Sequence, residues 1–101
     1  MDFSGGVTAG GRLAPGQPVS AEVSLTNLTD ERKEAVLYLA AYDNNGVLQA
    51  LGSERQTLYG QGAGTILSAT VETWADTCQV KAFLWDGKSC LPFGEAAILR
   101  K

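Results

Sequence analysis

Apolar and polar side chains alternate along several short segments, and turn-forming residues separate these segments about every ten positions. In the segment 19–26, for example, valine, alanine and leucine occupy every second position and Ser, Glu and Thr the others. Helical periodicity is hard to find. Alternation with regularly spaced turns is typical of strands in a sandwich or barrel. We therefore predict an all-β fold, an antiparallel sandwich of seven strands.

Six of the seven strands are clearly marked, and the first is weaker. The strong ones cover residues 19–26, 35–43, a segment between residue 47 and the glycine-rich loop 60–64, then 65–73, 78–86 and 96–100. The segment 3–9 is flanked by pairs of glycines, which give a strand little side chain to pack. We expect the first 15 residues to form an edge strand or a flexible arm.

The dipeptide Asn45-Gly46 is the strongest local signal, and it predicts a two-residue hairpin turn of type I′. Leu48 and Ala50, after this turn, are expected to join the face of Leu39 and Ala41. The predicted core draws on every strong strand, as two packed sheets require. Its members are Val23, Leu25, Leu37, Leu39, Ala41, Leu48, Leu67, Val71, Val80, Ala82, Leu84 and Leu99.

Length and composition fit one domain spanning residues 1–101. The chain is 45% hydrophobic and 19% charged, which is ordinary for a folded globular protein. Its net charge is −3 and its basic residues are scattered, so we do not expect it to bind nucleic acid. No apolar run is long enough to cross a bilayer. Residues 1–11 do not resemble a signal peptide, so an export signal, if the protein is exported, would lie outside these residues.

The residue types needed for common catalytic and metal sites are missing or scattered. The chain has no histidine, which removes the usual general base and the commonest metal ligand. Its acids lie in turns and on outward strand faces. The turn 43–46 lacks the spacing of a calcium loop. We expect no enzyme activity, no cofactor and no metal site.

Two cysteines, Cys78 and Cys90, raise the question of a disulfide. A strand running from residue 78 to 86 places Cys78 about 26 Å from the strand end near which Cys90 follows, whereas a disulfide needs Cα atoms within about 7 Å. We therefore favour unpaired cysteines, with Cys78 a buried small hydrophobic residue and Cys90 in a loop. Two cysteines without a third ligand do not make a metal site.

Aromatic residues are the candidates for contact with a ligand or partner. Tyr38, Phe83 and Trp85 fall on the strand faces opposite the predicted core, and Phe93 lies nearby in the last loop. An exposed aromatic patch would mark a binding surface. The alternative, which we favour, is that the last loop folds back over Trp85 or that a neighbouring domain covers this face. Trp74, alone in a loop, is the candidate for an isolated exposed aromatic.

Three segments carry a resemblance to a known family. The hairpin Ala40-Ala41-Tyr42-Asp43-Asn44-Asn45-Gly46-Val47-Leu48 is followed by Val80-Lys81-Ala82-Phe83-Leu84-Trp85-Asp86 and then by Leu91-Pro92-Phe93. Over residues 19–99 the chain resembles immunoglobulin-like or fibronectin-III-like modules of secreted or surface proteins of Gram-positive bacteria. The two cysteines depart from that pattern.

The resemblance implies an immunoglobulin-like β-sandwich that serves as a non-catalytic accessory module outside the cell or on its surface. Its expected role is structural or in protein interaction, with neighbouring domains of a larger protein as partners. An alternative is carbohydrate recognition, in which exposed aromatic side chains stack on a glycan or cell-wall polysaccharide. A third reading, a stand-alone cytosolic protein, rests on Met1 and on unpaired thiols.

Overall fold

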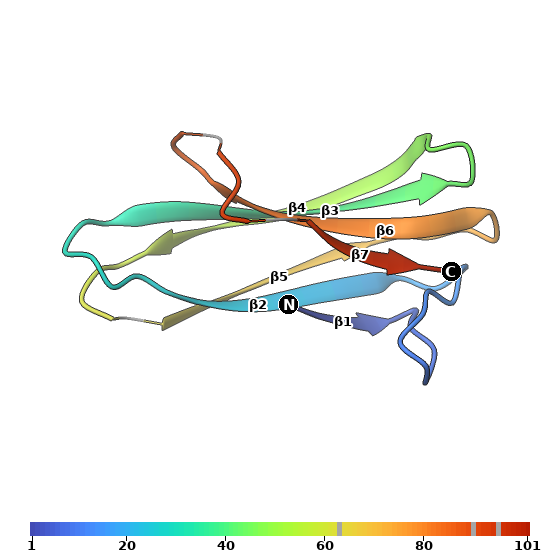
Figure 1. The fold of residues 1–101 in the computed structure, drawn as a ribbon, viewed down its shortest axis with the longest axis horizontal. Coiled ribbons are helices and arrows are strands. Elements are labelled where there is room, and N and C mark those ends of the chain that lie inside the picture. Colours follow the sequence, from blue (N-terminus) through green and yellow to red (C-terminus); the bar gives the residue numbers. More distant parts are fainter. Residues whose placement is uncertain (63, 90, 95) are drawn as a thin grey trace.

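Two antiparallel sheets packed face to face form the structure, a computed structural model that describes residues 1–62, 64–89, 91–94 and 96–101 (Figure 1). One sheet has the strand order β1-β2-β5 and the other the order β4-β3-β6-β7. The strands are β1 (Asp2–Gly5), β2 (Val19–Thr26), β3 (Lys33–Asp43), β4 (Leu48–Leu58), β5 (Gly64–Val71), β6 (Thr77–Asp86) and β7 (Ala97–Arg100). No helix in the described residues is long and apolar enough to cross a membrane. The predicted seven-stranded β-sandwich is confirmed.

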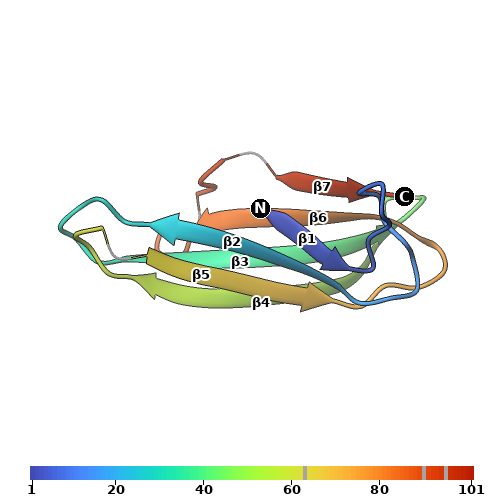
Figure 2. The same ribbon diagram turned by 90° about the horizontal axis from the view of Figure 1, so that it is seen from below.

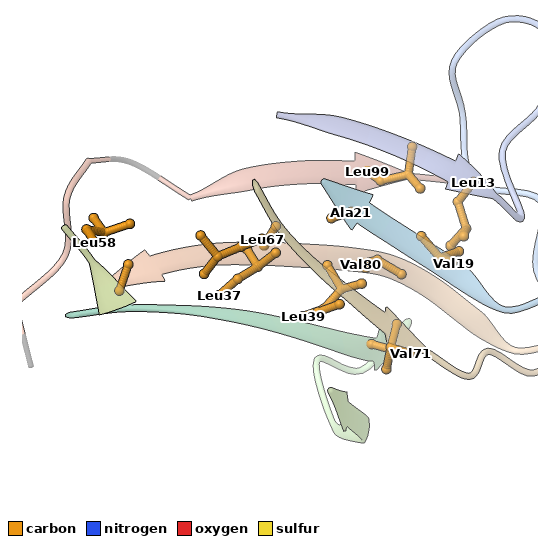
Figure 3. Close-up of a cluster of buried hydrophobic side chains, with 14 residues drawn as sticks. Leu13, Val19, Ala21, Leu37, Leu39, Leu58, Leu67, Val71, Val80 and Leu99 are labelled. Carbon is orange, nitrogen blue, oxygen red and sulfur yellow. The ribbon is translucent and has the colours of Figure 1, made fainter. Parts of the chain in front are cut away.

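The core lies between the sheets and comes from alternate positions of the strands. Leu37 and Leu39 of β3 and Leu67 of β5 are completely buried, and they face one another across the sandwich (Figure 3). Most predicted core residues are buried here or packed against the buried cluster. Further members are Leu13, Val19, Ala21, Ala35, Leu58 and Ala69, which the prediction left out.

The N-terminal segment is shorter as a strand than the predicted 3–9. β1 pairs with β2 only, so it lies at the edge of the three-stranded sheet (Figure 2). The chain then leaves the sheet in a glycine-rich loop. Leu13 in this loop is 3% exposed, and its N–H donates to the carbonyl of Arg100 in β7 at 2.7 Å. The loop thus supplies a core residue and connects the two sheets.

The β3–β4 hairpin has a three-residue loop, and the prediction of a two-residue type I′ turn is wrong. Gly46 N–H donates to Asp43 O, and Asp43 N–H donates to Val47 O, both at 3.1 Å. Of the loop residues only Gly46 has a positive φ, 78°. The Asp43 carboxylate accepts the N–H groups of Asn45 and Val47, at 2.8 and 3.0 Å, and so stabilises the longer loop.

The prediction that Leu48 joins the core is also wrong. Ala41 lies opposite Ala50, but the next pair is Tyr42 with Leu48, because Gln49 is an extra residue at a β-bulge. Residues directly opposite each other share a face of the sheet. Leu48 therefore lies with Tyr42 on the outer face, where it is 52% exposed.

A second bulge corrects the expectation that Cys78 is buried. Tyr42 lies opposite Gln79 and Asp43 opposite Thr77, so Cys78 is the extra residue in β6. Cys78 is only half-buried, while Thr77 is completely buried. Thr77 therefore fills the end of the core that the alternation assigns to Cys78.

The last predicted strand, 96–100, is present as β7. The connection before it contains Cys90, which lies outside the described residues. The expectations that Cys90 is a loop residue and that the two cysteines are unpaired therefore stay predictions.

Strands β4 and β5 close one side of the sandwich, where the edges of the two sheets meet. Gly52 of β4 lies so close to β5 that an added Cβ would be 2.1 Å from the carbonyl oxygen of Thr70. Two residues further along, the Glu54 carboxylate accepts hydrogen bonds from Gln56 Nε2 and from the backbone N–H of Ser68 in β5. These contacts hold β4 against β5 and occupy the Ser68 N–H, which would otherwise be an unpaired group at the edge of β5.

Asn27, directly after β2, connects the segments at the end of the sandwich where β2 ends and β3 begins. Its Nδ2 donates to the carbonyls of Glu31 (2.6 Å) and Leu58 (3.1 Å), and its Oδ1 accepts the N–H (3.0 Å) and hydroxyl (2.7 Å) of Thr29. The side chain is 5% exposed. All of its hydrogen-bonding capacity is thus used, which explains how a buried amide is tolerated there.

Replacing Gly52 with alanine should destabilise the protein by about 3 kcal/mol, because the added methyl group would overlap the Thr70 backbone and force β4 and β5 apart. Denaturant unfolding measures the loss. Gly10→Ala is the control, since a Cβ at Gly10 meets only an ordinary contact at 3.8 Å, and its effect should stay within about 0.5 kcal/mol. Equal effects for the two variants would contradict the close approach at Gly52.

Acid should weaken the β4–β5 contact. Hydrogen bonds from Gln56 and from the Ser68 N–H hold the pKa of Glu54 below its ordinary value in the folded state. The unfolded chain then binds more protons in acid, so this contribution to stability is complete above the unfolded pKa of about 4.3 and is lost as pH falls through the folded pKa. Glu54→Gln should flatten the dependence of unfolding free energy on pH in that range. An unchanged slope would show that Glu54 is not responsible.

Candidate binding face

The predicted aromatic residues Tyr38, Phe83 and Trp85 lie on the outer face of the four-stranded sheet. Tyr38 is opposite Phe83 in the β3–β6 register, and Trp85 is opposite Val36, so all of them share one face. They are on this face because β3 and β6 carry the core on their other positions. The sequence predicts this grouping correctly.

These aromatic residues belong to a larger apolar surface with an open hollow of about 340 Å³. Ala40 forms its floor and is only 3% exposed, while Leu51 on β4 is 60% exposed at its side. We call this surface the apolar face. It consists of Tyr38, Ala40, Tyr42, Leu48, Leu51, Phe83 and Trp85.

The rings of the apolar face meet edge to face. Tyr38 and Trp85 have ring centroids 5.3 Å apart and planes 69° apart, and for Phe83 and Trp85 the values are 6.4 Å and 65°. Such pairs stabilise one another. Because neighbouring rings are steeply inclined, they form the wall of a hollow and do not form a flat platform. The face offers few polar groups, namely the tyrosine hydroxyls and the indole N–H.

Two connections between strands project beyond the apolar face, one at each of its ends. Figure 1 shows the β3–β4 hairpin and the described parts of the β6–β7 connection projecting from the four-stranded sheet, away from the three-stranded sheet. The β6–β7 connection is held by Asp86, whose carboxylate accepts the N–H groups of Lys88 (2.8 Å) and Ser89 (3.2 Å). These two bonds lower the pKa of Asp86.

The expectation that the last loop covers Trp85 is wrong for the described residues. The loop pairs with the end of β6 side by side, through a bridge between Trp85 and Pro92 and a bond from Phe93 N–H to Leu84 O at 2.8 Å. Leu91 and Phe93 are 64% and 46% exposed. The described part of the loop therefore lies beside the end of β6, in line with the sheet, and leaves the hollow open.

Phe93 does not join the apolar face. It lines a different depression, at the end of the sandwich where β2 ends, together with Leu25, Leu28 and Leu58. The grouping of Phe93 with Trp85 is therefore not supported, because the backbone pairing of the loop turns Phe93 toward the other sheet.

Trp74 is 49% exposed in the turn between β5 and β6, apart from both apolar surfaces. Its backbone N–H donates to the Thr77 hydroxyl (2.8 Å), which donates to Gln49 Oε1 (2.6 Å). Gln49 Nε2 donates in turn to the Asp76 carboxylate at 2.9 Å. The exposed indole thus lies on the same turn as the Asp76 carboxylate, which is hydrogen-bonded to Gln49 of β4.

The outer face of the three-stranded sheet has the opposite character. Its outward positions on β2 and β5 are mostly hydroxyl-bearing, and Ser20 and Thr70 are hydrogen-bonded across the strands at 2.7 Å. Ile66, 59% exposed, is the single large apolar residue at these positions. Apolar exposure is therefore concentrated on one of the two outer faces.

Four residues of the apolar face lie outside the sequence prediction. Ala40 and Tyr42 are outward positions of β3 and could have been found by the same alternation. Leu51, next to the inward Ala50, could have been found in the same way, whereas Leu48 could not, because the bulge at Gln49 reverses the alternation at that end of β4. Comparison with protein-family models, with curated proteins and with solved structures found no significant match.

Proposed function

We propose that this chain is a non-catalytic interaction module of a larger extracellular bacterial protein, and that it docks a neighbouring domain or partner protein on the apolar face. The observation that carries the proposal is the open hollow on that face, with Leu48 and Leu51 exposed beside the aromatic residues. Single exposed apolar residues are ordinary. A contiguous patch of them is typical of an interaction site.

The strand order supports an immunoglobulin-like module. In constant-type members of that family, the first, second, fourth and fifth strands share one sheet and the third, sixth and seventh share the other, and variable-type members add strands to the second sheet. The orders β1-β2-β5 and β4-β3-β6-β7 fit this arrangement except at β4, which lies beside β3 on the sheet that gains the added strands. The likeness of the hairpin 40–48 and of the segment 80–86 to Gram-positive surface modules supports an extracellular location.

The apolar face has the composition of the centre of a protein interface. Tyrosine and tryptophan dominate such centres, where they fill or line pockets that exclude water. Trp85 and Tyr38 are held by their contact with each other and are half-exposed, so a partner could bury them with little loss of side-chain freedom.

Carbohydrate recognition is a second candidate, and the observation that favours it is the surroundings of Trp74. Sugars bind where a ring face lies beside polar groups, and Trp74 lies on the same turn as Asp76, whose carboxylate accepts a hydrogen bond from Gln49 of β4. The apolar face suits a sugar less well, since its rings are inclined and its polar groups are few.

Selection of a random peptide library against the folded chain tests the docking proposal. We expect the enriched peptides to lose at least about tenfold in affinity for Leu51→Asp, because a charge would enter the hollow. Ile66→Asp is the matched control, since Ile66 is equally exposed on the opposite face. Both variants should unfold within about 0.5 kcal/mol of the parent chain.

A second variant separates loss of shape from added charge. Ala40→Phe should fill the hollow from its floor and reduce binding of the same peptides without changing the charge. Peptides that bind equally to Leu51→Asp and to the parent chain, or a library that yields no binder, would contradict docking on the apolar face.

For the carbohydrate candidate, pull-down on insoluble polysaccharides and a glycan array give the measurement. Binding that depends on stacking should fall at least about tenfold in Trp74→Ala, since aromatic contacts of this size contribute more than 1 kcal/mol. Trp85→Ala serves as the comparison on the other surface. Failure of the parent chain to bind any glycan would remove this candidate.

A further inference from the structure

Charges around the apolar face are unbalanced, and they point to the chemistry of its partner. The outward strand positions of the four-stranded sheet carry three basic residues, Arg55, Lys81 and Arg100, and one acid, Glu34. Glu34 is paired with Arg55, with Nη1 2.6 Å from Oε2. Among the described residues, neither Lys81 nor Arg100 forms a salt bridge. The outward strand positions on the β6–β7 side of the hollow are therefore basic, although Arg100 shares a separate depression with Asp43 and the whole chain has a net charge of −3.

Lys81 lies directly beside the hollow. Its Nζ is 5.3 Å from the centroid of the Tyr42 ring, which is part of the hollow's lining. Opposite Lys81, on the β7 side, is Ile98, which is 42% exposed and extends the apolar surface. A group bound in the hollow would thus lie within reach of an ammonium that has aromatic and aliphatic neighbours.

The other outer face has the reverse charge. Asp2 of β1 lies opposite Glu22 of β2 on the outward side of the three-stranded sheet, and its described strand positions hold no basic residue facing outward. The basic rim is thus a property of the apolar face, since the two faces differ in both polarity and sign of charge.

We infer that the occupant of the apolar face is an acidic protein segment that inserts one large apolar side chain into the hollow and places carboxylates near Lys81 and Arg100. This inference rests on the proposed docking function and names the partner's chemistry. A hollow of about 340 Å³ with inclined walls is better suited to a projecting side chain of the partner than to a flat partner surface. Carboxylates of the partner that lie near the basic residues at the rim would add attraction and speed association without having to be buried.

A second copy of the chain fits less well. Two copies that met through this same face would bring the basic rims of both together, and like charges at an interface oppose association. A symmetric dimer would use the same patch on both copies. The charge pattern therefore favours a different, acidic protein.

Three synthetic peptides of equal length test the inference: one tryptophan flanked by aspartates, by serines or by lysines. Fluorescence anisotropy of labelled peptides at low ionic strength measures their affinity for the folded chain. We expect the aspartate peptide to bind about tenfold tighter than the lysine peptide, with the serine peptide between them. Added salt should reduce this preference, because exposed charges are screened.

Charge reversal locates the preference. Lys81→Glu should remove or invert it, and Arg100→Glu should reduce it, while Arg12→Glu, with the same change of net charge in the β1–β2 loop, should leave it intact.

Equal binding of all three peptides to the parent chain, with loss of binding in Leu51→Asp, would overturn the inference of an acidic partner but not the docking proposal. A preference unaffected by Lys81→Glu would also overturn it, as would a dimer of the chain that Leu51→Asp dissociates. If none of the peptides binds in a way that depends on Leu51, both the inference and the docking proposal are contradicted.

Discussion

Strand β3 is the element on which the rest of the structure depends. It is paired on both edges, with β4 and with β6, and it is apolar on both faces. Leu37 and Leu39 fill the centre of the core, while Tyr38 and Ala40, between and beside them in sequence, form part of the outer surface. A strand of this composition can only be central, because an edge position would leave both its backbone groups and its side chains exposed.

The alternation along the strands predicts the fold well, because period-two patterns report directly which side of a sheet is buried. It places most of the core correctly and puts Tyr38, Phe83 and Trp85 on one face. It fails for Leu48 and Cys78, since one extra residue at a bulge reverses every side chain beyond it. No pattern in the residues around Gln49 predicts such a bulge.

Residues outside strands were also missed, for a different reason. Leu13 is buried because a hydrogen bond to Arg100 of β7 holds the glycine-rich loop where this side chain enters the core. Asn27 is buried because four hydrogen bonds satisfy its amide. Both positions depend on contacts between segments far apart in the sequence. Alternation describes only neighbours along the chain, and so it cannot find them.

A β-sandwich can bind another chain through a sheet edge or through a sheet face, and on the β4 side of this molecule the two are not equally open. At β4, Gly52 brings the backbone against β5, and Glu54 occupies the Ser68 N–H, so this edge has little room for an added strand. The adjoining face is open, apolar and hollowed. Binding there would depend on side chains, and specificity would come from the shape of the hollow and the charges on its rim.

The bulge at Gln49 contributes to this face, since it moves Leu48 from the core side to the outer surface. The irregularity that defeats the sequence prediction is thus also the feature that enlarges the candidate site.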